Sequence, residues 1–251
     1  MENKSKQQTE YYNYKFVKHI RYNSEGSIEN WTEHEFDKNG NELKTFEYDS
    51  DGNVNYWYET EYDNNGNKIK LTEYDSDGRN NWWYEKEYDE NNRQIKHIYY
   101  NPAGSIYWWR ETEYDNNGNE IKQTEYDSNG SIDWWFETEY DENNRQIKHI
   151  YYKPDGSINS WHEKEYNKNG KMIKHTVYDS DGSIYWWGET EYNKNGNEIK
   201  FTRYNSDGKI IYCQECEYDD NGNKVRLNCF DPDGKIQSVI EYEYQKPETT
   251  E

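Results

Sequence analysis

A repeat of 26 residues runs through this chain and restricts its fold more than any other feature. Eight full units cover residues 36–243, and a ninth, degenerate unit covers residues 10–35. A unit of this length cannot bury its apolar face alone, so successive units are expected to stack into a continuous array. We predict a single array over residues 10–244, whose last two units act as a cap, with a flexible N-terminus at 1–9 and a disordered tail at 245–251.

Each unit contains two turn signals. The first is Asn-Gly, as at Asn65-Gly66, and the second is Asp-Gly or a related pair, as at Asp77-Gly78. Both dipeptides accept positive φ angles and suit two-residue hairpin turns. The segments between them are rich in Ile, Thr, Tyr and Trp, which favour strands. The sequence therefore predicts an all-β fold of tandem β-hairpins. It is an extended antiparallel meander of about 18 strands, and the sheet can be flat, coiled into a superhelix or closed.

Two-residue turns define a register that brings opposite charges together. Glu61 then lies opposite Lys70, Tyr62 lies opposite Ile69, and Lys70 also faces Glu85 on its other neighbour. The Lys70 column is basic and the Glu85 column is acidic in all nine units. Opposite charges facing each other across strands stabilise a sheet by roughly 0.2–1 kcal/mol a pair, so this register is physically consistent. A three-residue turn with a bulge would shift the pairing by one residue.

The alternation of side chains along a strand assigns each column to one of two faces. One face carries Lys70, Thr72, Tyr74, Trp83, Glu85 and Glu87. The other carries Ile69, Leu71, Trp82, Tyr84 and Tyr88. This second face is the better candidate for a core, although polar side chains such as Arg110 also lie on it. Because aliphatic residues are sparse, no thick conventional core is expected.

One tryptophan recurs at the same position in seven successive units, and this column is the main candidate binding feature. Its members are Trp31, Trp57, Trp83, Trp109, Trp135, Trp161 and Trp187. Neighbouring strands lie about 4.8 Å apart, so the indoles should recur every ~9–10 Å. If exposed, they form a ladder that can stack on sugars or on an extended apolar ligand. The hydrogen-bonding groups beside them would be Tyr74, Tyr100, Tyr126, Glu85, Glu111 and Glu137. Alternatively, each indole packs on a tyrosine of the next strand and stabilises the sheet.

Metal and cofactor sites find little support in the sequence. The Asp-x-Asp-Gly turns at 49–52, 75–78 and 179–182 suggest calcium, but each offers two carboxylates where calcium needs six to eight oxygens. Cys213 and Cys216 are three residues apart on a strand and therefore point to opposite faces. The histidines of one column are too far apart to share a metal: His97, His149 and His175. We predict no metal, no cofactor and no catalytic residue.

Charge and cysteine content restrict the partners and the compartment. A formal net charge of −21 disfavours nucleic acids and anionic membranes. No apolar signal region follows the N-terminus, and no stretch approaches the ~20 apolar residues of a membrane helix. The three cysteines form no disulfide framework. We therefore expect a cytoplasmic protein without membrane insertion, and export by a route that needs no signal peptide stays open.

The recurring Tyr-Asp-x-x-Gly motif, at 62–66, 74–78 and 126–130, resembles the YD repeats of RHS-type proteins. That resemblance implies a long, spiralling β-sheet and a bacterial toxin or cell-surface system, in which this chain would be a structural, accessory or immunity protein. The adjacent pairs Trp108-Trp109 and Trp134-Trp135 are not part of that motif. A weaker second resemblance is to MORN-type repeats, which also combine a hairpin with aromatic and glycine positions.

The columns favour binding over catalysis. Nine near-identical copies of each carboxylate column argue against an enzyme, because an active site breaks a repeat's symmetry. We predict a non-enzymatic scaffold that presents an aromatic and acidic surface to a macromolecular partner, either a protein or a glycan. A carbohydrate-binding module that uses the tryptophan ladder is the first alternative. The open ends of the sheet also allow edge-to-edge self-association.

Overall fold

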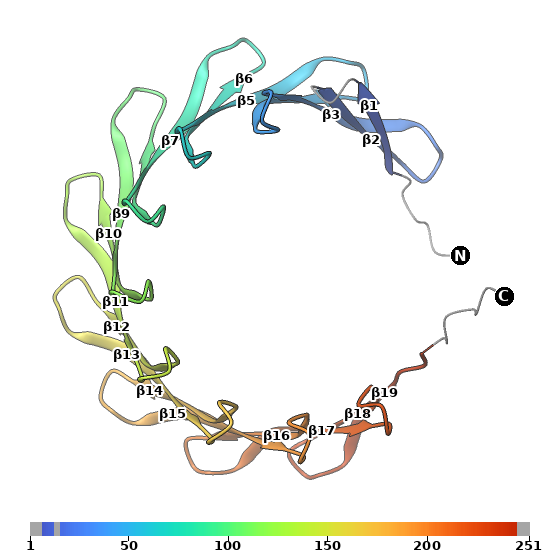
Figure 1. Ribbon diagram of the computed structural model, residues 1–251, viewed down its shortest axis with the longest axis vertical. Coiled ribbons are helices and arrows are strands. Elements are labelled where there is room, and N and C mark those ends of the chain that lie inside the picture. Colours follow the sequence, from blue (N-terminus) through green and yellow to red (C-terminus); the bar gives the residue numbers. More distant parts are fainter. Residues whose placement is uncertain (1–6, 13–15, 245–251) are drawn as a thin grey trace. The chain divides into compact units, whose positions relative to one another are not determined.

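The computed structural model describes residues 7–12 and 16–244, and there it consists of strands and the turns that join them (Figure 1). The predicted tail at 245–251 and residues 1–6 of the predicted flexible N-terminus lie outside the described residues. In the described part of the chain, no helix is long and apolar enough to cross a membrane. The all-β prediction is confirmed.

Two compact units make up the chain, Met1–Asp133 and Trp134–Glu251. The first holds the strands β1 (Gln7–Tyr12), β2 (Phe16–Tyr22), β3 (Ile28–Phe36), β4 (Glu42–Asp49), β5 (Val54–Tyr62), β6 (Lys68–Asp75), β7 (Asn80–Tyr88), β8 (Gln94–Tyr100), β9 (Ile106–Tyr114) and β10 (Glu120–Asp127). The border falls within β11 (Ile132–Tyr140). The second unit continues with β12 (Gln146–Tyr152), β13 (Ile158–Tyr166), β14 (Met172–Asp179), β15 (Ile184–Tyr192), β16 (Glu198–Asn205), β17 (Ile210–Tyr218), β18 (Lys224–Phe230) and β19 (Ile236–Glu241).

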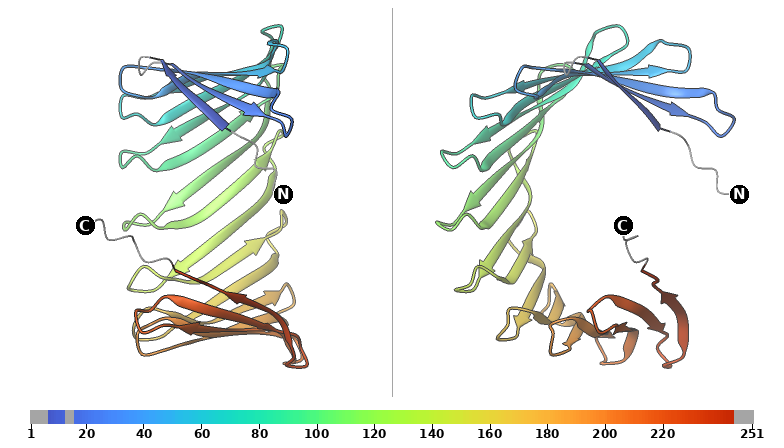
Figure 2. Two further views of the ribbon diagram at one scale, coloured as in Figure 1. Left: turned by 90° about the vertical axis from the view of Figure 1, so that its right-hand side faces the viewer. Right: turned by 45° about the vertical axis from the view of Figure 1, so that its right-hand side comes forward.

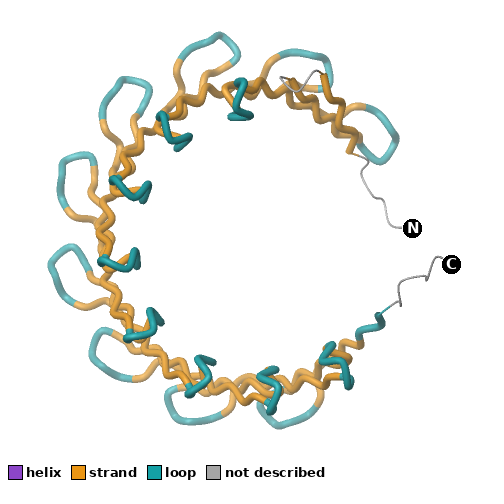
Figure 3. Tube along the Cα trace, in the orientation of Figure 1, coloured by secondary structure: helices purple, strands orange, loops and turns teal. Residues whose placement is uncertain are grey.

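Within each unit, every strand pairs with the next one along the chain, and all pairs are antiparallel. The pairs run from β1–β2 to β9–β10 in the first unit and from β11–β12 to β18–β19 in the second. Figure 2 shows neighbouring strands pointing in opposite directions, and Figure 3 shows the short turns that join them. The predicted meander is therefore observed, with 19 strands among the described residues in place of about 18. The additional strand, β1, begins at Gln7, ahead of the predicted start of the array.

The turns have three residues, so the predicted two-residue turns are wrong. In the turn after β5, the Gly66 N–H donates to the Asp63 carbonyl (3.1 Å) and the Asp63 N–H donates to the Asn67 carbonyl (3.0 Å). Gly66 has a φ of 85°, which is the left-handed conformation that follows a type I turn in a three-residue hairpin loop. Asn92 takes the same place without a glycine, with a φ of 60°.

The aspartate of a Tyr-Asp pair accepts hydrogen bonds within most of these turns, whereas in the turn after Tyr178 the acceptor is Asp181. Oδ1 of Asp63 accepts hydrogen bonds from the backbone N–H groups of Asn65 (2.9 Å) and Asn67 (2.8 Å). The Asn67 side chain donates to the other carboxylate oxygen (2.9 Å) and, as the largest influence, lowers the pKa of Asp63. Asp49 accepts the equivalent bonds from Asp51 and Asn53. These carboxylates are thus occupied by the turn itself, as expected of Asp at such positions.

A bulge next to each turn restores the predicted register. Tyr62 lies opposite Lys68, not opposite Ile69 as predicted, but the pairing shifts by one residue between Glu61 and Tyr62. Glu61 then lies opposite Lys70, and Lys70 lies opposite Glu85, as predicted. The extra loop residue shifts the pairing by one position, and the bulge shifts it back by one. The predicted assignment of side chains to faces therefore holds in the middle of each strand.

Neither face of the described sheet forms an apolar core, as expected from the sparse aliphatic residues, and this includes the second face, the better candidate. No described side chain is completely buried, and the buried apolar residues are few: Ile20, Val177, Cys213 and Cys216. Most buried residues are threonines, which lie on both faces. Thr60 is opposite Leu71 on one face and Thr72 is opposite Trp83 on the other. The stability of such a sheet must come from contacts between neighbouring side chains on each surface.

Candidate binding surfaces

Each indole of the tryptophan column stacks on a tyrosine of the next strand. Ring centroids are 4.0–5.0 Å apart and the planes differ by 9–16°. The pairs are Trp31–Tyr48, Trp57–Tyr74, Trp83–Tyr100, Trp109–Tyr126, Trp135–Tyr152, Trp161–Tyr178 and Trp187–Tyr204. Such pairs contribute about 0.5–1.5 kcal/mol beyond the area they bury. The stacks are therefore a main source of cohesion on this face.

The indoles also have neighbours on their other side. Trp57 lies between Tyr74 and Phe46, whose ring centroid is 5.5 Å away. Trp83 has Thr72 opposite it on the preceding strand, and a Cβ added to Gly104 would lie 3.6 Å from its ring. All seven indoles are half-buried. This is the geometry of indoles that pack within the sheet, the second of the two alternatives for this column.

The carboxylates beside the stacks are engaged by hydrogen bonds and ion pairs. The Tyr100 hydroxyl donates to Glu85 (3.2 Å), the Tyr126 hydroxyl to Glu111 (3.5 Å), and Lys96 lies 3.0 Å from Glu111. The same bond joins further pairs along the column, Tyr74–Glu59 and Tyr152–Glu137. Burial, followed by the charge of Glu85, raises the pKa of Tyr100, so its hydroxyl stays a donor. In the predicted columns, each Trp thus stacks on a Tyr, and several of these Tyr hydroxyls donate to a Glu.

The opposite face of the first unit carries a second group of aromatic residues, here named the aromatic cluster: Trp82, Tyr84, His97, Tyr99 and Trp108. Tyr99 stacks on Trp108 at 4.3 Å, and His97 meets Tyr84 edge-on at 4.8 Å. The guanidinium of Arg110 lies 5.4 Å from the centre of the Trp108 ring and 2.6 Å from Glu125. Burial, then the charges of Lys86 and Arg110, lower the pKa of His97 to about 4. His97 is therefore neutral at physiological pH.

An open hollow of about 460 Å³ adjoins the aromatic cluster at the edge of the sheet. Its walls are Trp82, Tyr99, Tyr100, Asn101, Pro102, Tyr107 and Trp108. We name it the aromatic hollow. Tyr107 is 66% exposed, the largest exposed fraction among the exposed large apolar side chains of the described residues. Of the residues around this hollow, only Tyr100 was among the binding residues predicted from the sequence, which belong to the column of Trp109 and its neighbours. The available signal was the pair Trp108-Trp109, which puts one indole on each face.

A group of histidines occupies the same kind of surface in the second unit. Nδ1 of His162 lies 3.1 Å from Nε2 of His175, and Nδ1 of His149 lies 2.8 Å from the Thr138 hydroxyl. Burial is the main cause that lowers the pKa values of His149 and His175 to about 4. His162, which lies opposite His149, was not among the histidines singled out from the sequence. Within the described ranges, no group of three His, Cys, Asp or Glu side chains could hold a metal ion.

One sequence family matches part of the chain. Its description is "Protein of unknown function (DUF2963)", and it matches residues 48–99, a stretch two repeats long. The match covers less than half of the chain and does not establish membership. No curated protein sequence matches the chain. The resemblances to YD repeats and to MORN-type repeats therefore stay predictions.

Solved structures similar to the chain include TcdB2-TccC3, at 12% identity over 90% of this chain and 17% of that chain, with a TM-score of 0.27. The structure of TcdB2-TccC3-Cdc42 is 13% identical over 86% of this chain and 15% of that one, with a TM-score of 0.24. A porin-like protein from Bacteroides uniformis is 8% identical over 94% of this chain and 95% of that one, with a TM-score of 0.39. The chain spans less than a fifth of the first two. No functional conclusion follows from TM-scores this low.

Proposed function

We propose that this chain is a non-enzymatic repeat scaffold that binds a protein partner through the aromatic hollow of its first unit. The observation that carries the proposal is the exposure of Tyr107 beside Trp82 and Trp108 around an open apolar space. Trp, Tyr and Arg dominate the binding energy of protein interfaces when they lie together around a pocket. Arg110, over the Trp108 ring, adds the third of these residue types.

The charge of the chain suggests which segment of a partner would fit. At a net charge of −21, a segment with basic residues is attracted and steered to the surface. The hollow itself is lined mainly by aromatic side chains and would take an apolar anchor side chain. We therefore expect a segment that carries one large apolar residue flanked by lysine or arginine.

The repeat supports a scaffold in preference to an enzyme. The Lys70 and Glu85 columns recur in all nine units. Several units form an ion pair between the two columns, such as Lys44–Glu59 at 2.7 Å, whereas Lys70, Lys122 and Lys174 pair with the neighbouring carboxylates Glu61, Glu113 and Glu165. Carboxylates that form structural ion pairs throughout the repeat are not singled out for acid–base chemistry. The stacked tryptophans likewise support the sheet, so sugar binding by the ladder is the less favoured alternative.

The test is selection of binding peptides from a random displayed library on the whole chain. Tyr107→Ala should weaken the selected peptides at least tenfold. Tyr185→Ala is the matched control, because Tyr185 holds the equivalent repeat position in the second unit and is also exposed, at 61%. Equal binding to both variants would contradict the proposal. Oligosaccharide binding that is lost in Trp109→Ala and kept in Tyr107→Ala would support the carbohydrate alternative instead.

A further inference from the structure

The tryptophan column ends at Cys213, although the backbone of the repeat continues unchanged. Cys213 lies 26 residues after Trp187. It is opposite Thr202 on one side and Phe230 on the other. Trp187 is likewise opposite Thr176 and Tyr204. A small side chain therefore stands where earlier units place an indole.

The groups that hold an indole in earlier units are still present around Cys213. Earlier units show a ring stacked on the indole, a lysine over it, a carboxylate at its N–H and a turn glycine at its edge. Examples are Tyr204 stacked on Trp187 (5.0 Å), Lys18 over Trp31 (4.4 Å), the Trp161 N–H donating to Glu163 (3.2 Å) and Gly208 beside Trp187. The residues at the same repeat positions here are Phe230, Lys200, Glu215 and Gly234.

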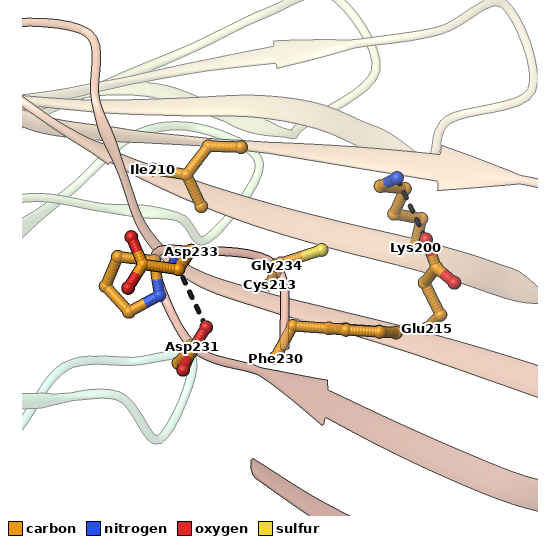
Figure 4. Close-up of a pocket in the computed structure, with 9 residues that line it drawn as sticks. Lys200, Ile210, Cys213, Glu215, Phe230, Asp231, Asp233 and Gly234 are labelled. Carbon is orange, nitrogen blue, oxygen red and sulfur yellow. Dashed lines mark hydrogen bonds and ion pairs between the residues drawn. The ribbon is translucent and has the colours of Figure 1, made fainter. Parts of the chain in front are cut away.

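These four residues line one open pocket of about 410 Å³ together with Cys213, Ile210, Asp231, Pro232 and Asp233 (Figure 4). A Cβ added at Gly208 would lie 3.5 Å from the Trp187 ring, whereas one added at Gly234 meets no atom within 4 Å. The pocket thus includes the space that the indole fills one unit earlier. An apolar cavity of about 150 Å³ is enough to bind benzene.

We propose that this pocket binds a planar aromatic ligand of the indole type, in the place of the missing tryptophan. The Phe230 ring offers a stacking surface, and the Lys200 ammonium favours an electron-rich ring. Glu215, paired with Lys200 at 2.9 Å, has the position from which Glu163 accepts the indole N–H. Glu215, Asp231 and Asp233 select against an anionic ligand. The site lies in the second unit and is independent of the aromatic hollow.

Two sources can supply this chemistry, free indole or a tryptophan side chain of another polypeptide. Isothermal titration of the whole chain with indole, and separately with N-acetyltryptophanamide, distinguishes them. Indole should bind in either case. The amide binds comparably only if a side chain attached to a backbone can enter the pocket. Methylation of the indole nitrogen removes the donor to Glu215 and should weaken binding severalfold.

The decisive variant is Cys213→Trp, which restores the repeat and fills the pocket with the chain's own indole. It should lower the affinity for indole at least tenfold. Cys216→Ser, on the opposite face, is the matched control and should bind like the unchanged chain. If circular dichroism shows that Cys213→Trp is not folded, Phe230→Ala replaces it and should also weaken binding about tenfold. No heat of binding at millimolar indole, or equal binding by the unchanged chain and the folded variant, would overturn the proposal.

Discussion

The stacks of the tryptophan column can be tested with one pair, Trp109 and Tyr126. Replacing a fully buried Trp by Ala costs about 3–5 kcal/mol. Trp109 is half-buried, so Trp109→Ala should cost about 2 kcal/mol of unfolding free energy, and Tyr126→Ala a similar amount. The two rings stack at 4.8 Å with an angle of 11°. The interaction energy of such a pair is about 0.5–1.5 kcal/mol, so the double variant should lose about 1 kcal/mol less than the sum of the single losses.

Urea unfolding followed by circular dichroism measures all four proteins of this cycle. The control combines Trp57→Ala with Tyr126→Ala, since Trp57 on β5 stacks on Tyr74 and shares no neighbour with Tyr126 on β10. These two changes should add within ~0.3–0.5 kcal/mol. A coupling of Trp109 to Tyr126 no larger than that of the control pair would refute the idea that the stacks hold the sheet together.

Three further outcomes are expected. Folding lowers the pKa values of His97 and His149 to about 4, so the unfolded chain binds more protons than the folded chain between pH 6.5 and 4. The melting temperature should therefore fall as the pH is lowered from 6.5 to 4. A melting temperature that does not change over this range would contradict the burial of these rings. Gly66→Ala should lower the free energy of unfolding in urea by about 1–2 kcal/mol, because φ is positive at Gly66. Asn92→Gly should leave the free energy of unfolding unchanged or raise it. Equal losses of stability in the two variants would argue against the three-residue turn. Calcium at millimolar concentration should leave the melting temperature unchanged, because the Asp49 carboxylate already accepts hydrogen bonds within its turn. A higher melting temperature in calcium would indicate a bound ion.

Several features followed from the sequence because they depend on local chemistry repeated nine times. Asp-Gly and Asn-Gly predict turns whatever surrounds them, and the charge columns of Lys70 and Glu85 restrict the register. The register in the middle of the strands was nevertheless predicted correctly from a turn length that was wrong. A bulge compensates the additional loop residue, as where the pairing shifts between Glu61 and Tyr62 and leaves Ile69 outside the register, and neither the alternation nor the charge columns required it.

The candidate sites were harder to predict because they depend on departures from the repeat. A tryptophan column suggests an exposed ladder, but whether an indole is free or packed depends on the residues across the strands, such as Tyr74 and Phe46 around Trp57. The loss of tryptophan at Cys213 was visible in the sequence as the end of a column. That the surrounding groups remain in place and leave a space became evident only from the pocket.

The β-hairpin repeat, the alternation of faces and the absence of a thick core could be predicted from the residues alone, because these features depend on residues within one or two strands. The tertiary structure alone decided how the rings meet, which carboxylates are already bonded and where a hollow remains. Those properties arise from side chains that lie 15 to 20 residues apart along the chain, such as Tyr100 and Glu85 or Tyr62 and the Glu42 carbonyl. Their contacts depend on the bulge and turn geometry, which decides the residues that face each other across neighbouring strands.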